Sequence, residues 1–273
     1  MDYQLFHIFR NTPLGRETLL QSAFFCKTVG LAPTVYIPES TKFLMYFDND
    51  VVQVDLDSSY LTDPETAKNH ASEIIESFGC EFGFLEPKHY TASTLPDIPT
   101  NFEFMCCPRS ISDLSSKIGL GYIGPRVRRI VKSAKFPVLL TSPTFKPWNS
   151  IAVLFGGSTN AINAVKLGMR ISRVSGKKLT IYTQMENKPR EEYEDLLKKA
   201  GLADEISSNV KNWVIFNKGR LESNLYAIPH DALVVIGAYG HGLIRDFVFG
   251  SKMETIQSVI SNNLLIVGPN YTS

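Results

Sequence analysis

The sequence predicts an α/β protein built from two doubly wound parallel-sheet domains that repeat one another along the chain. Short apolar runs typical of buried strands alternate with longer amphipathic runs typical of helices. The same order of elements begins near residue 5 and again near residue 151, and landmark residues of the two copies keep a constant spacing. The alternation predicts parallel sheets, and the spacing predicts a pseudo-twofold tandem repeat.

The opening of each copy reads as a strand, a capped helix and a second strand. Thr12 is a typical N-cap, and Gly30 closes the amphipathic run as a helix-ending glycine does. Ser158 and Gly176 stand 146 residues later in the second copy, in the same two roles. The apolar runs that follow each glycine predict a second strand in each copy.

The ends of the two copies also match, but with a spacing of 126 residues. Each copy ends with a glycine, a helical run, a short apolar strand and a proline. The matched residues are Gly124, Ile130, Val138 and Pro143 in the first copy and Gly250, Ile256, Leu264 and Pro269 in the second. The smaller spacing means that the first copy has about 20 extra residues in its middle.

The extra residues lie between Pro38 and Asp63, where two β-rich runs flank an Asp-Asn-Asp turn. This pattern predicts a hairpin-like insert at residues 38–63. One domain is therefore expected at residues 1–148, with the insert, and the other at residues 150–273.

Composition indicates an ordinary globular protein and argues against several functions. The net charge of +1 provides no basic excess for nucleic acid or for a membrane surface. No apolar run approaches the roughly 20 residues of a membrane-spanning helix, and residues 1–9 do not read as a signal peptide. The four cysteines have neither metal nor disulfide spacing, which predicts reduced thiols in a cytoplasmic protein.

A compact β-branched strand at residues 233–236 leads into the glycines that carry the chemistry of the second copy. Gly237 and Gly240 follow this strand, and Gly250 with Ser251 opens a helix predicted at residues 252–261. Glycines let a backbone approach a ligand closely, and the free N–H groups of a helix N-terminus favour phosphate. The alternative is that these glycines serve only tight turns and packing.

The pattern Gly-x2-Gly-x9-Gly-Ser before a last helix and strand resembles the ATP-binding motif of the universal stress proteins. Residues 151–158 resemble the first strand and turn of that family, so the whole chain looks like a tandem member. The resemblance implies the adenine nucleotide alpha hydrolase-like fold, with five-stranded sheets that dimerise through their last strands. In this chain the dimer would be an internal pseudo-dimer of residues 138–140 and 264–266, and a homodimer is a further option.

The resemblance also implies a set of nucleotide contacts in the second copy. Thr183 would contact adenine, and the remaining positions would lie along the ribose and phosphates: Ile236, Gly237, Gly240, Gly250, Ser251 and the backbone of Lys252. ATP, with or without Mg²⁺, is the cofactor that this set implies. No catalytic residue and no protein ligand to a metal is expected.

Two departures from the family pattern bear on this expectation. The family usually has an aspartate just before the Gly-Ser of its first turn; here that position is Gly156, so a directional acceptor for adenosine is missing. In the first copy Arg10 stands there, and the positions of two glycines and the serine are taken by Pro108, Ile111 and Pro125. Since proline has no N–H to give a phosphate, we expect the first copy to be degenerate and to bind no nucleotide.

Four basic residues of the first copy allow two interpretations. They could form an anion site of their own, but a solvated basic face is the simpler expectation. These residues are Arg109, Lys117, Arg126 and Arg128.

The sequence favours a cytoplasmic, non-enzymatic stress-response or regulatory module that binds ATP or another adenine nucleotide. No Walker lysine, nucleophile motif or paired carboxylates accompany the glycines. One alternative is an ATP-using hydrolase or transferase on the same sheet, because related sheets support both kinds of activity. The other is a dimer scaffold that binds no nucleotide, which the glycine at position 156 favours.

Overall fold

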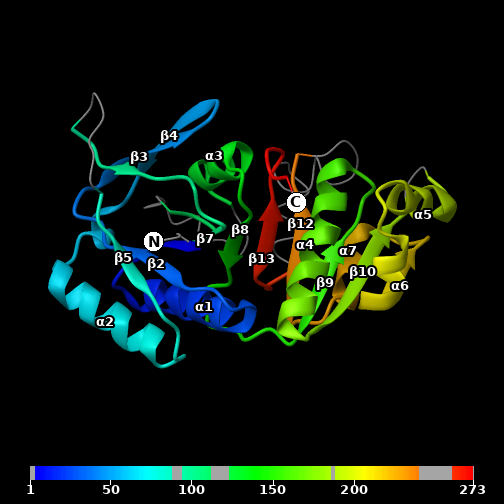
Figure 1. The fold of residues 1–273 in the computed structure, drawn as a ribbon, viewed down its shortest axis with the longest axis horizontal. Helices are drawn as coiled ribbons and strands as arrows, with labels where there is room; N and C mark the ends of the chain where they lie inside the picture. The colour runs from blue at the N-terminus through cyan, green and yellow to red at the C-terminus, as the bar shows by residue number, and fades with distance from the viewer. Residues whose placement is uncertain (1–3, 88–93, 112–122, 186–187, 240–259, 273) are drawn as a thin grey trace.

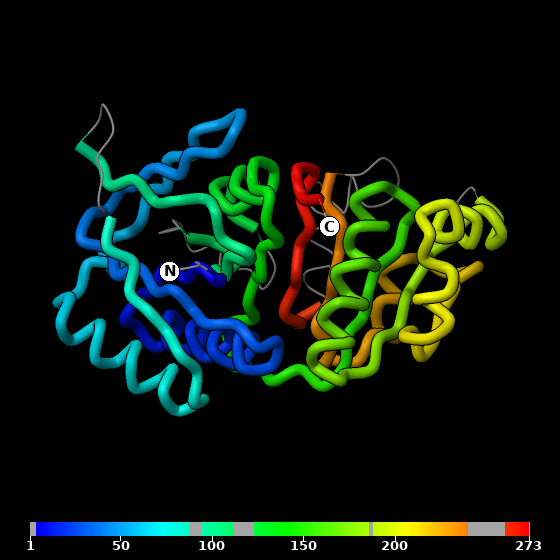
Figure 2. The backbone as a smooth tube through the Cα atoms, viewed as in Figure 1, coloured from blue at the N-terminus to red at the C-terminus, as the bar shows by residue number. Residues whose placement is uncertain are grey.

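The computed structural model describes residues 4–87, 94–111, 123–185, 188–239 and 260–272. In these residues a ten-stranded sheet runs through the molecule in the order β11-β10-β9-β12-β13-β8-β7-β1-β2-β5 (Figure 1). A second, three-stranded sheet has the order β4-β3-β6. The two halves of the chain lie side by side, as the change of colour from blue and green to yellow and red shows in Figure 2.

The first half begins with β1 and a helix that starts and ends where the sequence predicts. The Thr12 side chain accepts a hydrogen bond from the Gly15 N–H, and Gly30 adopts the left-handed conformation with φ of 73°. Its elements are β1 (Leu5–Ile8), α1 (Pro13–Val29), β2 (Pro33–Tyr36), β3 (Lys42–Phe47), β4 (Asp50–Asp55), the 3-10 turn η1 (Ser58–Tyr60), α2 (Pro64–Glu76), β5 (Gly83–Leu85), β6 (Asp97–Ile98), β7 (Phe104–Pro108), α3 (Pro125–Ser133) and β8 (Val138–Thr141).

The second half repeats this opening, with Ser158 capping the helix through the Ala161 N–H and Gly176 ending it at φ of 68°. Its elements are β9 (Ser150–Leu154), α4 (Thr159–Ser175), β10 (Lys178–Gln184), α5 (Arg190–Lys199), α6 (Ala203–Asn209), β11 (Val210–Phe216), α7 (Leu221–Asn224), the 3-10 turn η2 (Leu225–Ala227), β12 (Ala232–Gly237) and β13 (Leu264–Val267).

Each half contributes five strands in one shared topology. Numbered along its own half, the sheet order from the outer edge inward is third, second, first, fourth and fifth, and all pairs within a half are parallel. The predicted α/β fold class, two doubly wound parallel-sheet copies in a pseudo-twofold tandem, is confirmed. The boundary between the copies near residues 148–150 stays a prediction.

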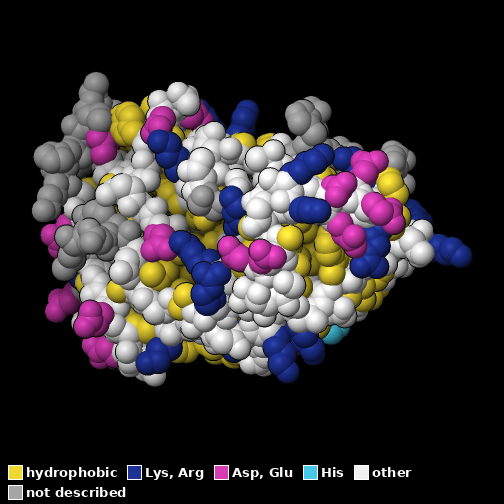
Figure 3. Space-filling model, turned by 45° about the vertical axis from the view of Figure 1, so that its right-hand side comes forward, with side chains coloured by type: hydrophobic (Ala, Val, Ile, Leu, Met, Phe, Trp, Pro, Cys, Tyr) yellow, Lys and Arg dark blue, Asp and Glu magenta, His cyan; other side chains and the backbone are white. Residues whose placement is uncertain are grey.

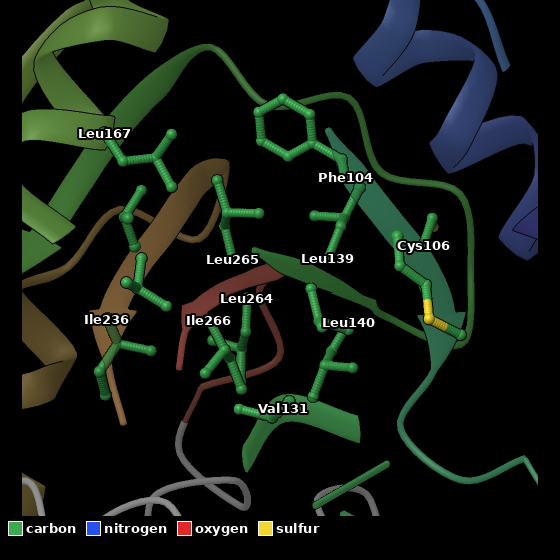
Figure 4. Packing of buried hydrophobic residues seen from close by; sticks show 14 of the residues in the cluster. Phe104, Cys106, Val131, Leu139, Leu140, Leu167, Ile236, Leu264, Leu265 and Ile266 are labelled. Carbon is green, nitrogen blue, oxygen red and sulfur yellow. The ribbon is translucent and has the colours of Figure 1, made fainter. Parts of the chain in front are cut away.

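The halves join along β8 and β13, the two strands that the sequence proposed as partners. They pair antiparallel, with Leu264 opposite Leu140, Leu265 opposite Leu139 and Ile266 opposite Val138. Figure 4 shows Leu139 and Leu265 on one face of the joined sheet, and Leu140, Leu264 and Ile266 on the other face, where Val131 of α3 also lies. Because this pair is antiparallel, the carboxyl ends of the parallel strands lie at opposite edges of the sheet in the two halves.

The insert of the first half contains the predicted hairpin. Strands β3 and β4 pair antiparallel around Asp48 and Asn49, and β6 adds to β3 in parallel. Two ion pairs join the hairpin to α3, Arg126 with Asp55 at 2.5 Å and Arg129 with Asp50 at 2.6 Å, and a third joins Asp48 to Lys135 just after the helix. Hydrogen bonds from Arg129 and Ser133 lower the pKa of Asp50 to about 2.

The described surface mixes charges of both signs. Figure 3 shows acidic and basic side chains interspersed on the face that it presents. In the described part of the chain, no helix combines the length and the apolar character needed to cross a bilayer.

Candidate functional site

The candidate nucleotide site lies where the strand order of the second half changes direction. From β9 the chain continues to β10 and β11 on one side, and then returns to β12 and β13 on the other. The loops that follow β9 and β12 therefore flank a topological switch point at the carboxyl edge of the sheet. Open α/β sheets bind their ligands in this crevice.

The loop after β9 is built by backbone geometry rather than by polar side chains. Phe155 is buried, and its N–H donates to the Tyr182 carbonyl at 2.9 Å. Gly157 has a φ of 79°, and a Cβ there would lie 3.0 Å from a methyl carbon of Leu196. Gly156 is half-buried, and it brings no side-chain acceptor to the place where the family has its aspartate.

Gly237, at the end of β12, packs directly against the first turn of α4. A Cβ on this glycine would lie 2.3 Å from the carbonyl carbon of Asn160 and 2.6 Å from the nitrogen of Ala161. The absence of a side chain at Gly237 is thus explained by packing. Packing was the alternative to ligand binding for the glycines of this motif. The close approach also brings the N-terminus of α4 next to the end of β12, so helix N–H groups lie at the switch point.

The turn after β12 is held by hydrogen bonds on both sides. The Ala238 N–H donates to the Val267 carbonyl at 2.8 Å, and the Asn160 side chain donates to the Ala238 carbonyl at 2.5 Å. Tyr239 then takes a φ of 59°, in the left-handed region that residues other than glycine rarely adopt. Ile236 is buried between neighbouring strands, so any ribose contact by this residue would come from its backbone.

Thr183 lies on β10 and is fully buried. The indole N–H of Trp213 donates to its hydroxyl at 3.0 Å, and the Trp213 ring packs edge-on against Phe155 at 6.0 Å between centroids. The hydroxyl therefore already accepts one hydrogen bond from the protein, and its full burial means that neighbouring side chains would have to move for adenine to reach it. The role of Thr183 stays a prediction.

The phosphate-binding part of the predicted site lies outside the described residues. This applies to Gly240, Gly250, Ser251 and Lys252, and to most of the helix predicted at residues 252–261. The last two residues of that range, Ile260 and Ser261, are described and are not helical. Among the residues that the structure does describe, no three or more His, Cys, Asp or Glu side chains cluster in a way that could hold a metal ion.

The equivalent switch point of the first half lies between β1 and β7, and the insert fills it. Arg10, which follows β1, lies 3.5 Å from the carboxylate of Asp57 and 5.3 Å from the centroid of the Tyr60 ring. Both insert side chains are buried, and burial raises the pKa of the Tyr60 hydroxyl well above its usual range. The chain's own residues therefore occupy the place that corresponds to the adenosine side of the other site.

Arg109 does not lie on a solvated basic face, so that expectation was wrong for this residue, while the alternative of an anion site stays a prediction. Its guanidinium reaches across the β8–β13 seam and donates to the carbonyls of Asn262 at 2.9 Å and Ile260 at 3.3 Å. The other described residues of that basic group are also engaged, Arg126 with Asp55 and Arg128 with the Ile123 carbonyl at 2.7 Å. The reason is the antiparallel seam, which brings the loop after β7 beside the start of β13.

Among the described histidines, His7 has the one clearly shifted pKa, and it lies on β1 in the core of the first half. His7 Nδ1 and the Ser22 hydroxyl are 2.7 Å apart, and burial lowers the pKa of the imidazole to about 3. Burial likewise raises the pKa of the nearby Cys106 thiol to about 12. All four cysteines are free, and three of them are buried. These groups are inert core residues rather than candidates for catalysis.

Comparison with known proteins identifies the fold. No family model and no curated protein sequence matches the chain. Among solved structures, a universal stress protein from Archaeoglobus fulgidus DSM 4304 is 13% identical; the alignment covers 98% of this chain and 99% of that one, with a TM-score of 0.64. A protein from Pseudomonas aeruginosa UCBPP-PA14, provisionally assigned to the universal stress proteins, is 10% identical over 98% and 94% of the two chains, with a TM-score of 0.57.

The same architecture also occurs in a protein that is not described as a universal stress protein. The cytoplasmic domain of a prokaryotic cation chloride cotransporter is 11% identical, over 97% of this chain and 95% of that one, with a TM-score of 0.51. At these identities the comparisons establish the fold, which is that of the tandem universal stress proteins. The predicted resemblance is confirmed at this level.

Three features of the two switch points could not be read from the sequence. They are the filling of the first site by Asp57 and Tyr60, the bond between Thr183 and Trp213, and the reach of Arg109 across the seam. Each depends on a contact between residues far apart in the chain. The Asp57-Ser-Ser sequence, typical of a local cap, was the one visible sign of a turn at that position.

Proposed function

We propose that the chain is a tandem universal stress protein that binds ATP, or another adenine nucleotide, in its C-terminal half. It acts as a stress-response or regulatory binding module rather than as an enzyme. The observation that supports this best is the concentration of glycines at one switch point. Gly156 and Gly157 follow β9, and Gly237 ends β12 at the same edge of the sheet; in the sequence Gly240 comes three residues later.

Backbone groups make this crevice suited to an anion. The N-terminus of α4 is drawn against β12 at Gly237, and Gly250 with Ser251 is expected to add a second helix N-terminus. Helix N-termini carry about half a positive charge and free N–H donors, so together they favour the phosphates of a nucleotide. With no aspartate at position 156, affinity would depend on the phosphates more than on the base.

Calorimetric titration of the nucleotide-stripped protein with ATP tests this proposal. We expect saturable binding of one ATP per chain, with GTP as the control for base selectivity. Binding of ATP and GTP with equal affinity would support the idea that Gly156 has removed base selection. Absence of binding by any adenine nucleotide would overturn the proposal.

A second measurement separates a binding module from an ATP-using enzyme. Steady-state ATP hydrolysis should be absent or far slower than the roughly 1 to 1,000 turnovers per second of ordinary enzymes, because no general base is positioned at the described part of the crevice. Turnover in the ordinary range would favour the hydrolase or transferase alternative.

The scaffold alternative has one observation in its favour. The Thr183 hydroxyl, expected at the adenine, is bonded to Trp213. If the titration shows no binding, the protein is better described as a scaffold of this fold. The crevice of the second half would then be closed by contacts within the protein, as we propose for the first half.

A further inference from the structure

We infer that strand β11, at the outer edge of the second half's sheet, docks onto β11 of a second copy of this chain. The two strands pair antiparallel about a twofold axis at Val214 and join two ten-stranded sheets into one. This contact differs from the dimer that the family resemblance implies, because β8 and β13, the last strands, already pair with each other inside the chain. It is also independent of nucleotide binding.

The pairing at the seam leaves the ten-stranded sheet with two outer edges. Strand β5 forms one end of the sheet and β11 forms the other. In the part of the chain that the structure describes, β5 pairs only with β2, and β11 pairs only with β10. The outer side of an edge strand presents peptide N–H and C=O groups that another strand can satisfy. A strand from another chain can therefore join this sheet at β5 or at β11.

The edge at β5 has the features with which proteins block such pairing. The strand is only three residues long, Gly83–Leu85, and it begins with glycine. Glu86 follows it and forms an ion pair with Lys68 at 3.6 Å, and Pro87 comes next. A short strand followed by a charge and a proline offers few groups to a partner.

The edge at β11 is longer, and it contains neither proline nor glycine. It spans seven residues, Val210–Phe216. Its amino end is protected, because the register with β10 skips Lys211, whose side chain is exposed. Residues 213–216 are apolar and half-buried. The open part of this edge is therefore the carboxyl half of the strand.

One hydrogen bond shows which peptide groups of β11 point outward. The Phe216 carbonyl accepts the Met185 N–H at 2.9 Å, so residue 216 bonds toward β10. Because bonding direction alternates along a strand, Val214 also bonds toward β10, whereas Trp213 and Ile215 direct their peptide groups outward. These two residues provide two donors and two acceptors for a partner strand.

The outward groups are complementary to themselves in one antiparallel register. With Val214 opposite the partner's Val214, Trp213 lies opposite the partner's Ile215, and each such pair exchanges two hydrogen bonds. An aromatic and a β-branched side chain then meet directly across the strands, which stabilises a sheet. The twofold axis produces this favourable pair twice.

The protected edge at β5 favours this closed dimer over a filament. A contact between β11 and β5 would repeat from chain to chain, but β5 offers too short a strand for it. Pairing of β11 with itself closes about the axis and leaves only β5 edges at the two ends of the joined sheet. A joint of one strand pair predicts a weak, concentration-dependent dimer.

The first test is sedimentation velocity of the full-length chain from micromolar to near-millimolar concentrations, with Ile215→Pro as the blocking variant. Proline at residue 215 removes an outward N–H and leaves the bonds between β10 and β11 in place, as prolines on natural edge strands do. We expect the wild type to dimerise as its concentration rises and the variant to remain monomeric. Circular dichroism and thermal unfolding check that the variant is folded.

Variants of the exposed residue Asn217 test the register without disturbing the fold. In the proposed pairing Asn217 lies opposite the partner's Lys211. Asn217→Glu should therefore tighten the dimer about three- to tenfold, and Asn217→Lys should weaken it by a similar factor, since each contact occurs twice. Asn101→Glu and Asn101→Lys are the matched controls, because they change the charge equally at an exposed asparagine of the first half.

A thiol on the axis gives a direct readout of the contact. Val214→Cys places two thiols opposite each other, so oxidised glutathione should link two chains by a disulfide. In Asn212→Cys, the control on the same strand, the thiol lies opposite the partner's Phe216 and should form few such links.

A wild type that stays monomeric at every concentration would overturn the inference and leave this edge to an extended segment of another protein. A dimer that ignores both Asn217 variants and is not linked in Val214→Cys forms elsewhere, and it would overturn the inference as well. Neither result bears on nucleotide binding, which the calorimetric titration tests separately.

Discussion

The two halves of this protein have the same strand topology but different residues at the equivalent switch points. At the switch point of the second half, Gly156 and Gly157 follow β9 and Gly237 ends β12. At the equivalent point of the first half, arginines follow both strands, and each is committed to a contact within the protein. The proposed ligand site is therefore in the second copy, while the corresponding residues of the first copy make contacts within the protein.

The difference shows that two copies of one fold can have different residues at the same point of the sheet. Arg10 contacts Asp57 and Tyr60 of the insert in the first half. Arg109 reaches across the seam to the other copy. The strand topology of the two halves is nevertheless the same.

The largest expected effect that would test this comparison is loss of binding in Gly240→Val. A branched side chain at a close-approach glycine blocks the phosphate, so we expect affinity for ATP to fall by more than about 100-fold, which corresponds to about 2.8 kcal/mol. Titration calorimetry measures the effect, and circular dichroism should show an intact fold. A stoichiometry of two nucleotides per wild-type chain, or full binding by this variant, would show that the site is elsewhere.

The next effect concerns stability. Gly237→Ala would place a Cβ 2.3 Å from the carbonyl carbon of Asn160, so α4 would have to move away from β12. We expect a loss of about 3 kcal/mol in the free energy of unfolding, at the upper end for overpacking. Gly176→Ala is the control: its φ of 68° is strained for alanine but the space around it is open, so the cost should be about 1 kcal/mol. Equal losses in denaturant titrations would contradict the close packing.

Acid should weaken the first half before the second. His7 is buried with its pKa lowered to about 3, whereas Val153 stands at the matching position of the other copy. The unfolded chain takes up a proton below about pH 6.5 and the folded chain does not, so stability is complete above that pH and falls as the pH drops toward 3. Between pH 7 and pH 5.5 the loss should be about 1 kcal/mol.

The measurement for this pH effect is hydrogen exchange in each half at several pH values, with intrinsic rates corrected. The variant His7→Asn should flatten the pH dependence of the first half whatever its overall stability. Equal acid sensitivity of β1 and β9 in the wild type would argue against the buried neutral histidine as the cause.

The smallest effect is expected at the serine of the glycine motif. Ser251→Ala removes one hydroxyl from a cradle made mainly of backbone groups, so ATP binding should weaken by about 1 kcal/mol. Pro125→Ala makes a change at the matching position of the first half and should leave the affinity as it is. A larger effect of Pro125→Ala than of Ser251→Ala would reverse the assignment of the two copies.

The sequence by itself determined the elements, their repetition and the strands that meet at the seam. Thr12, Ser158, Gly30 and Gly176 mark helix ends through local hydrogen bonds and backbone conformation, and these signals do not depend on distant residues. The pairing of β8 with β13 was predicted from the resemblance to a family that dimerises through its last strands.

Only the tertiary structure decided which residues occupy each crevice. The carboxyl edges of the two halves lie at opposite edges of one sheet because the seam is antiparallel, and this places Arg109 beside Asn262 and Tyr239 beside Arg128. No local pattern in the chain encodes these encounters, since they join residues more than 100 positions apart. Local interactions therefore specified the secondary structure, while contacts between distant loops decided which partners the side chains at the seam have.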